Sequence, residues 1–152
     1  MIVPGVRVGQ WTLGLTLDDL IRMHGRPVRT HVMAALPPDA YAVFDHMVFR
    51  WDRVTVAATT LVGLKRVELL QTGFLMPAGR HYRTDRSIGF MATRQQIVNV
   101  YGRPTAEVVP QPLEIRMIYD EEGVAFSLDM AGRVHTILVF RPRTAGRFWY
   151  LF

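Results

Sequence analysis

Two stretches decide the fold: TLDDLIRMHGRP, from Thr16 to Pro27, and TRQQIVNVYGRP, from Thr93 to Pro104. Each begins with Thr, is apolar at helical spacing in its middle, and ends on Gly-Arg-Pro. Thr is a favourable helix N-cap, Gly suits the left-handed position after the last turn, and Pro prevents continuation of the helix. Each stretch is therefore predicted to be a short helix of about ten residues, and Gly-Arg-Pro is predicted to be a helix stop rather than a ligand loop.

The segments that follow the two helices also correspond. MVFRWD (47–52) parallels RMIYD (116–120), VTVAA (54–58) parallels VAFSL (124–128), and LKRVELL (64–70) parallels RVHTILVF (133–140). The later segments alternate as strands of a sheet with one covered face do, and Asp and Gly stand where hairpins need them. The sequence predicts an α+β protein of two tandem repeats, each a short helix followed by an antiparallel three-strand meander, with the helices on one face of the sheet.

The predicted organisation is a first repeat at 1–72, a connector at 73–87 and a second repeat at 88–152. The connector is rich in Gly, Pro and Arg, but it is short and carries an apolar run from Phe74 to Met76. One three-strand sheet with a single helix has little core, so the two repeats are predicted to pack into one compact domain.

Composition restricts the chemistry. The chain has 152 residues, a formal charge of +5, a single lysine and no Cys. Disulfides, thiol catalysis, Cys-ligated zinc and iron–sulfur clusters are thereby excluded, and no cofactor is expected. No apolar run approaches the roughly 18 residues of a spanning helix, and no signal-peptide pattern opens the chain. The protein is expected to be cytoplasmic as numbered, or exported if a leader was trimmed.

Catalytic patterns are missing from the sequence. The five histidines show neither His-x-His nor His-Glu-x-x-His spacing, so no metal site is expected. The only serines, Ser87 and Ser127, do not lie in Gly-x-Ser-x-Gly. The carboxylate pairs Asp18-Asp19 and Glu121-Glu122 fall at a helix start and in a turn, where solvated charges are ordinary. The protein is therefore expected not to be an enzyme.

The predicted functional surface is the sheet face without helices. Trp51 and Tyr119 occupy matching places in the two copies and are predicted to be core. Their strand neighbours then point to the other face, because side chains alternate along a strand. The predicted partner-binding face comprises Phe44, His46, Arg50, Arg116, Ser127 and His135. Through this face the protein is predicted to bind another protein of unknown identity.

Two alternatives stay open. In GRHYRTDR (79–86), Arg80, Arg83 and Arg86 recur every third residue with His81 and Tyr82 between them, a mixture that suits phosphates and stacked bases. A solvated connector, partly neutralised by an aspartate, accounts for it equally. Nucleic-acid or anionic-ligand binding is therefore the second hypothesis, and a small-molecule pocket between the repeats is the third.

From about Leu13 to Phe140 the chain resembles the tandem-repeat fold of the β-lactamase inhibitory proteins. It is also similar to the small lipoproteins of the bacterial outer-membrane assembly machine, which carry one such unit. The best-matched pieces are TRQQIVNVYGRP, WD at 51–52, YD at 119–120 and DMAGRV at 129–134. The resemblance implies helices on one side of a sheet whose other, concave face grips a partner protein.

Overall fold

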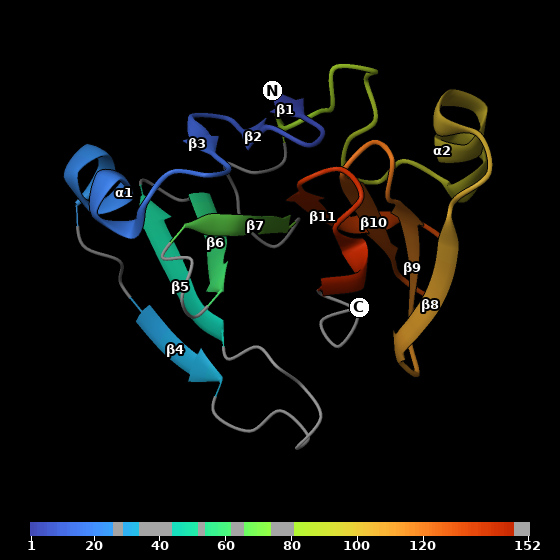
Figure 1. The fold of residues 1–152 in the computed structure, drawn as a ribbon. Coiled ribbons are helices and arrows are strands. Elements are labelled where there is room, and N and C mark those ends of the chain that lie inside the picture. Colours follow the sequence, from blue (N-terminus) through green and yellow to red (C-terminus); the bar gives the residue numbers. More distant parts are fainter. Residues whose placement is uncertain (26–28, 34–43, 52–53, 62–65, 74–80, 148–152) are drawn as a thin grey trace.

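A computed structural model describes residues 1–25, 29–33, 44–51, 54–61, 66–73 and 81–147 (Figure 1). Within 29–61 the description is confined to the backbone. The predicted α+β class is confirmed, with two short helices and antiparallel sheets. Neither described helix is long enough to cross a membrane.

The elements follow one another in a regular order. Helix α1 (Leu17–His24) precedes four strands, β4 (Arg29–Met33), β5 (Phe44–Trp51), β6 (Val54–Leu61) and β7 (Val67–Gly73). Helix α2 (Arg94–Tyr101) likewise precedes four, β8 (Ala106–Gln111), β9 (Glu114–Tyr119), β10 (Val124–Leu128) and β11 (Val134–Phe140). We call α1–β7 the first half and α2–β11 the second half. A small sheet of β1 (Ile2–Val3), β2 (Arg7–Val8) and β3 (Trp11–Thr12) opens the chain.

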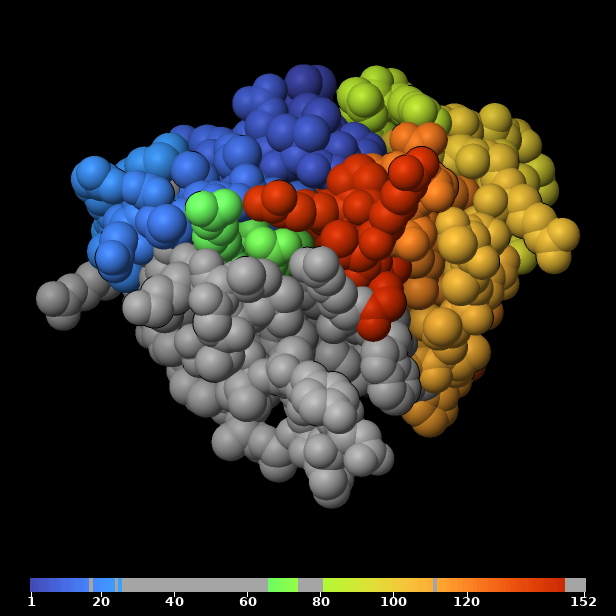
Figure 2. All heavy atoms as spheres, viewed as in Figure 1, coloured from blue at the N-terminus to red at the C-terminus, as the bar shows by residue number. Residues whose placement is uncertain are grey.

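The eight strands form one antiparallel sheet in the order β4-β5-β6-β7-β11-β10-β9-β8. Strands β7 and β11 pair in its middle, from Leu69↔Phe140 to Gly73↔Thr136, and join the two halves. Figure 2 shows β7 in green beside the red C-terminal end of the described chain. Strands β4 and β8 lie at the two ends of this order, so β8 pairs with β9 and with no other strand among the described residues.

The prediction of three strands after each helix is wrong, because β4 and β8 add a fourth. Neither segment gives a clear signal: β4 reads RTHVM, and β8 reads AEVVPQ with Pro110 inside it. Pro cannot donate a ladder hydrogen bond and is confined to edge strands or bulges, which is where β8 lies. Edge strands carry fewer packing contacts, so their sequences show weaker alternation.

Both helices begin and end as predicted. The Oγ1 atoms of Thr16 and Thr93 accept hydrogen bonds from the amides of Asp19 and Gln96, whose side chains accept from the Thr amides in return. Such reciprocal caps satisfy amides that have no partner within the helix. Gly102 ends α2 with φ +77°, and its amide donates to the Val98 carbonyl. Of the first Gly-Arg-Pro only Gly25, at φ +81°, lies within the described residues.

The core lies between the helices and one face of the sheet. Leu20 of α1 and Ile97 of α2 are completely buried there, together with Trp11, Phe126 and other apolar side chains. Tyr119 is 3% exposed and packs against Tyr101 at 5.3 Å between ring centroids, which confirms it as a core residue. The side chain of Trp51, the other predicted core aromatic, lies outside the described residues.

Replacement of Gly102 tests the helix stop. A Cβ at this position meets no atom within 4 Å, so the cost of Gly102→Ala is that of the backbone conformation alone, φ +77° and ψ −156°, which only Gly adopts readily. That cost is about 1–3 kcal/mol of unfolding free energy, measurable by urea denaturation. The control is Gly146→Ala, where space is equally open and φ is not positive. Equal stability of the two variants would contradict the assignment.

Candidate functional site

The sheet face away from the helices is covered in the second half. Arg116 and Ser127 lie on this face, as predicted, but they are only 7% and 0% exposed. Their neighbours Ile118, Leu138 and Phe140 are also buried. The expectation that Arg116 and Ser127 lie exposed on an open face is therefore wrong. Strand alternation specifies the face to which a side chain points, but it does not reveal what packs on that face.

Arg116, Ser127 and His135 nevertheless belong to one polar cluster. The Nε of Arg116 donates to Ser127 Oγ at 2.6 Å, and its Nη2 forms an ion pair with Glu114. His135 Nδ1 lies 2.9 Å from Thr136 Oγ1, and Nε2 lies 3.9 Å from Glu114 Oε2. The imidazole thus contacts Thr136 and Glu114 rather than the Ser127 hydroxyl. The buried Arg116 guanidinium thus has polar partners, and Ser127 accepts a hydrogen bond from Arg116 instead of donating one to a histidine base.

Phe44, His46 and Arg50, the other members of the predicted face, lie on β5. Their side chains are outside the described residues. In the sheet order β5 is four strand spacings from β10, which carries Ser127. At about 4.8 Å per spacing this separation is roughly 19 Å. The six predicted residues therefore come from two distant parts of the sheet.

The arginines of the connector are used in different ways. Arg80 lies outside the described residues, and Arg83 donates to the Ser87 carbonyl at 3.4 Å. Arg86 donates to both carboxylate oxygens of Glu122, at 3.1 and 3.2 Å, and lies 4.9 Å from the centre of the Tyr101 ring. Arg86 thus ties the connector to the β9–β10 turn. An anion would have to compete there with a carboxylate already in place.

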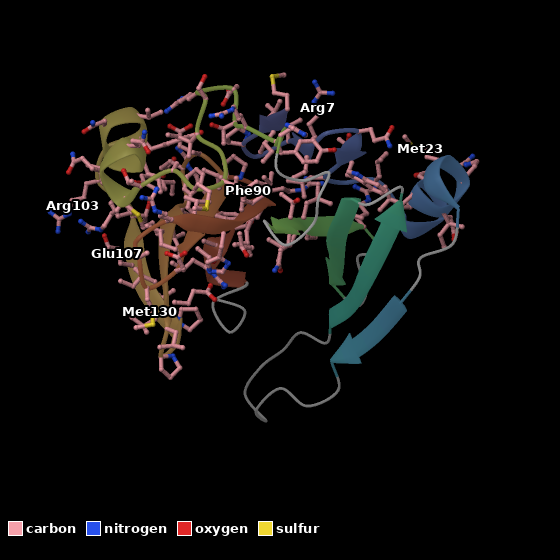
Figure 3. All side chains as sticks on the ribbon, turned by 180° about the vertical axis from the view of Figure 1, so that it is seen from behind. Arg7, Met23, Phe90, Arg103, Glu107 and Met130 are labelled. Atoms are coloured by element: carbon pink, nitrogen blue, oxygen red, sulfur yellow. The ribbon has the colours of Figure 1, made fainter. Side chains whose placement is uncertain are left out.

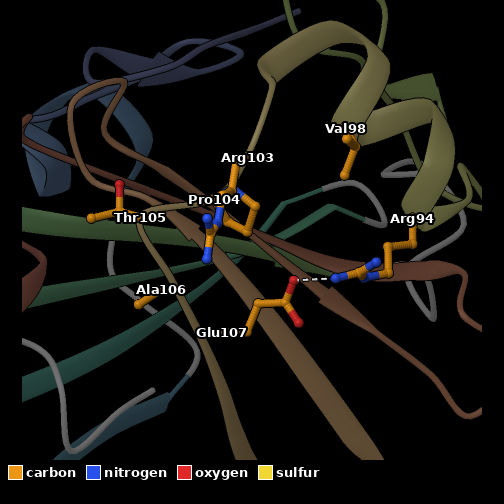
Figure 4. A pocket seen from close by; sticks show the side chains of 7 residues that line it. All are labelled: Arg94, Val98, Arg103, Pro104, Thr105, Ala106 and Glu107. Atoms are coloured by element: carbon orange, nitrogen blue, oxygen red, sulfur yellow. Dashed lines mark hydrogen bonds and ion pairs between the residues drawn. The ribbon is translucent and has the colours of Figure 1, made fainter.

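A hollow of about 590 Å³ lies at the outer end of the second half, where α2 meets β8. Its lining comes from α2, from the turn after it and from the start of β8 (Figure 4): Arg94, Val98, Arg103, Pro104, Thr105, Ala106 and Glu107. An ion pair between Arg94 and Glu107 joins the helix to the strand. Among the described residues, Arg103 has no hydrogen-bond or ion-pair partner.

The turn beneath the hollow is held by three hydrogen bonds. The Tyr119 hydroxyl donates to the Gly102 carbonyl at 3.0 Å, the Thr105 amide donates to the Ile118 carbonyl at 2.7 Å, and the Asp120 amide donates to Thr105 Oγ1 at 3.1 Å. Burial raises the pKa of Tyr119 to about 12, so its phenol stays protonated and keeps donating even at pH 10, where an ordinary tyrosine is half ionised. Arg103 and Thr105 are thus carried on a fixed backbone.

Exposed apolar side chains continue from the hollow along the same end of the molecule. They belong to the β8–β9 hairpin and the β10–β11 turn: Val109 (66% exposed), Leu113 (62%), Ile115 (43%) and Met130 (78%). We call these four residues the apolar end. Figure 3 shows Arg103, Glu107 and Met130 one below another on this side. An edge strand beside exposed apolar residues is typical of an interaction surface.

Sequence reasoning missed this site, although two signals pointed to it. Gly102 and Pro104 have backbone duties in the helix stop, which leaves Arg103 between them without a structural role. Pro110 within an apolar segment indicates an edge strand. The other lining residues come together only through the packing of α2 on β8, which the sequence does not show.

The described residues hold no group of His, Asp and Glu side chains able to bind a metal ion. Comparisons with family models, with curated proteins and with solved structures find no match.

Replacement of Ser127 tests the polar cluster. Ser127→Ala removes the hydroxyl that accepts from buried Arg116, which should cost about 1–3 kcal/mol of unfolding free energy. Gln95→Ala is the control, because the bond from Gln95 to Asn99 is exposed and its loss should cost less than about 0.5 kcal/mol. Urea denaturation of both variants makes the comparison. A silent Ser127→Ala would show that the cluster does not support the fold.

Tyr119 predicts a loss of stability at alkaline pH. Its pKa is raised from 10 to about 12, so the folded protein holds the phenol proton more tightly than the unfolded chain does. The resulting stability is complete below pH 10 and is lost as pH rises toward 12. Tyr119→Phe should therefore lose less stability over this range, as urea denaturation at several pH values would show. Tyr82 and Tyr101 remain in both proteins, so equal slopes would contradict the assignment.

Proposed function

We propose that the protein is a non-enzymatic binding module that holds an extended segment of another protein along β8. One observation carries the proposal: the end strand of the sheet adjoins both the hollow and the apolar end. Free strand edges offer backbone hydrogen bonds to an added strand, and neighbouring hollows and apolar residues select its side chains. This surface replaces the sheet face predicted from sequence, which is buried at Arg116 and Ser127.

The polar cluster and the connector support other functions less well. Arg116 is buried and paired with Glu114, and Arg86 is paired with Glu122. In the connector Arg83 is exposed and has no ion-pair partner among the described residues, but its guanidinium donates to the Ser87 carbonyl and it lies on no free strand edge of the eight-stranded sheet. The hollow, by contrast, includes Arg103 and opens beside a strand edge. An elongated partner therefore fits the described surface better than a compact anion does.

We further propose that the two halves are copies of one duplicated unit. In the first half the Gly14 amide donates to the Val67 carbonyl, and the Val67 amide donates to the Leu15 carbonyl. In the second half Met91, Val134 and Ala92 form the same two backbone hydrogen bonds, and all four distances are 2.7–2.9 Å. The register of each last strand also shifts at its first residues, so that Glu68 and His135 are the residues passed over. The predicted likeness to the β-lactamase inhibitory proteins stays a prediction.

Site-specific photocrosslinking in the native host tests the proposed surface. A photoreactive phenylalanine analogue at Val109 should give a crosslinked adduct, because this side chain is 66% exposed beside the strand edge. The control position is Met23 on α1, which is 57% exposed at the other end of the sheet. Leu113→Asp should abolish the Val109 adduct by placing a charge in the apolar contact. The same adducts from both positions, or none from Val109, would contradict the proposal.

A further inference from the structure

We propose that the segment bound at β8 is acidic toward the hollow and apolar toward the β8–β9 turn, with a carboxylate of the segment paired to Arg103. This inference rests on the proposed function and adds the chemistry of the partner. It follows from the charges of the hollow, from the length of the edge and from the place of Pro110.

The hollow has one positive charge in excess. Arg94 is neutralised by Glu107, whereas Arg103 is exposed and has no ion-pair partner among the described residues. A guanidinium presents paired donors that match the two oxygens of a carboxylate. Arg103 also lies on the turn fixed by Tyr119 and Thr105, so its backbone position is set before a partner arrives.

The distance along the edge sets the spacing of the ligand. Strand β8 begins at Ala106, three residue steps or about 10 Å before Val109, and Arg103 lies on the turn that precedes the strand. A bound strand of about four residues therefore lies along this part of β8, with its carboxylate beyond one end of the pairing, beside Arg103, and its apolar residues at the other. There Val109 and Leu113 offer apolar surface that a purely acidic segment would leave in water.

Pro110 limits the pairing of backbones. Because it lacks an N–H, the added strand pairs with the part of β8 that precedes Pro110 and meets the apolar end through side chains. Glu107 and the apolar residues also disfavour a nucleic-acid ligand, since a phosphate chain would pass over a carboxylate and then over Val109. The combined features fit a peptide strand that is acidic at one end and apolar at the other.

A displayed library of random peptides of about twelve residues tests the inference without a known partner. The whole protein, Arg103→Glu and Arg7→Glu serve as bait. Arg7 is an exposed arginine of the small N-terminal sheet, distant from Arg103 (Figure 3), and is the matched control. The wild type and Arg7→Glu should enrich peptides with Asp or Glu among apolar residues, whereas Arg103→Glu should enrich Lys or Arg instead.

Fluorescence anisotropy with one selected peptide gives the quantitative readout. Arg103→Glu should weaken binding by roughly fivefold or more, the size expected of one exposed ion pair converted to repulsion. A peptide with Lys in place of its acid should regain affinity on Arg103→Glu. Thermal unfolding by circular dichroism would establish that each variant is folded.

The outcomes separate the partner chemistry from the site. Suppose that the selected peptides show no acidic preference, bind wild type and Arg103→Glu equally, and lose binding on Val109→Asp. This result would overturn the acidic partner but would support the site along β8. No enrichment over an empty support, or binding indifferent to Val109→Asp, would overturn the proposed function itself. Competition for the same site by a short oligothymidylate would replace the peptide with nucleic acid and overturn both.

Discussion

The pairing of β7 with β11 is the constraint on which the structure depends. These are the last strands of the two halves, and their hydrogen bonds turn two four-stranded meanders into one sheet. The pair also contributes buried apolar side chains to both faces of the sheet. Leu70 and Val139 face the helices, while Leu69 and Phe140 are buried on the other face. Without this pair each half would be a small sheet with one short helix and little apolar surface to bury.

The central pair also determines which strands are left at the ends. Because β7 and β11 pair with each other in the middle of the sheet, β4 and β8 are left as its edge strands. The second half brings α2 over β8 through the Arg94–Glu107 ion pair and the Tyr119 hydrogen bond to Gly102, and the hollow forms between them. The position of the proposed binding surface is thus a consequence of how the halves are joined.

Local signals predicted the local structure well. Thr16, Thr93 and the glycines after each helix have roles set by their own backbone, so both helices could be predicted from sequence. The edge strands could not, because the sequences of β4 and β8, the end strands of the described sheet, alternate weakly. The candidate site could not be predicted from sequence for a different reason. Alternation placed Arg116 and Ser127 on the correct face, but it does not show what packs on that face. The hollow lies between neighbouring segments, yet it depends on how α2 packs on β8, which no local pattern specifies.

The register of the central pair has a further consequence. It is symmetric about Gln71↔Leu138, with Leu70 opposite Val139 on one side and Thr72 opposite Ile137 on the other. If the halves are copies, equivalent strands meet as they would across the two-fold axis of a homodimer. A covalent link makes such an assembly independent of protein concentration, with an effective concentration on the order of millimolar. Once linked, the two copies no longer need identical surfaces, and one outer edge is free to acquire a binding role while the joint is preserved.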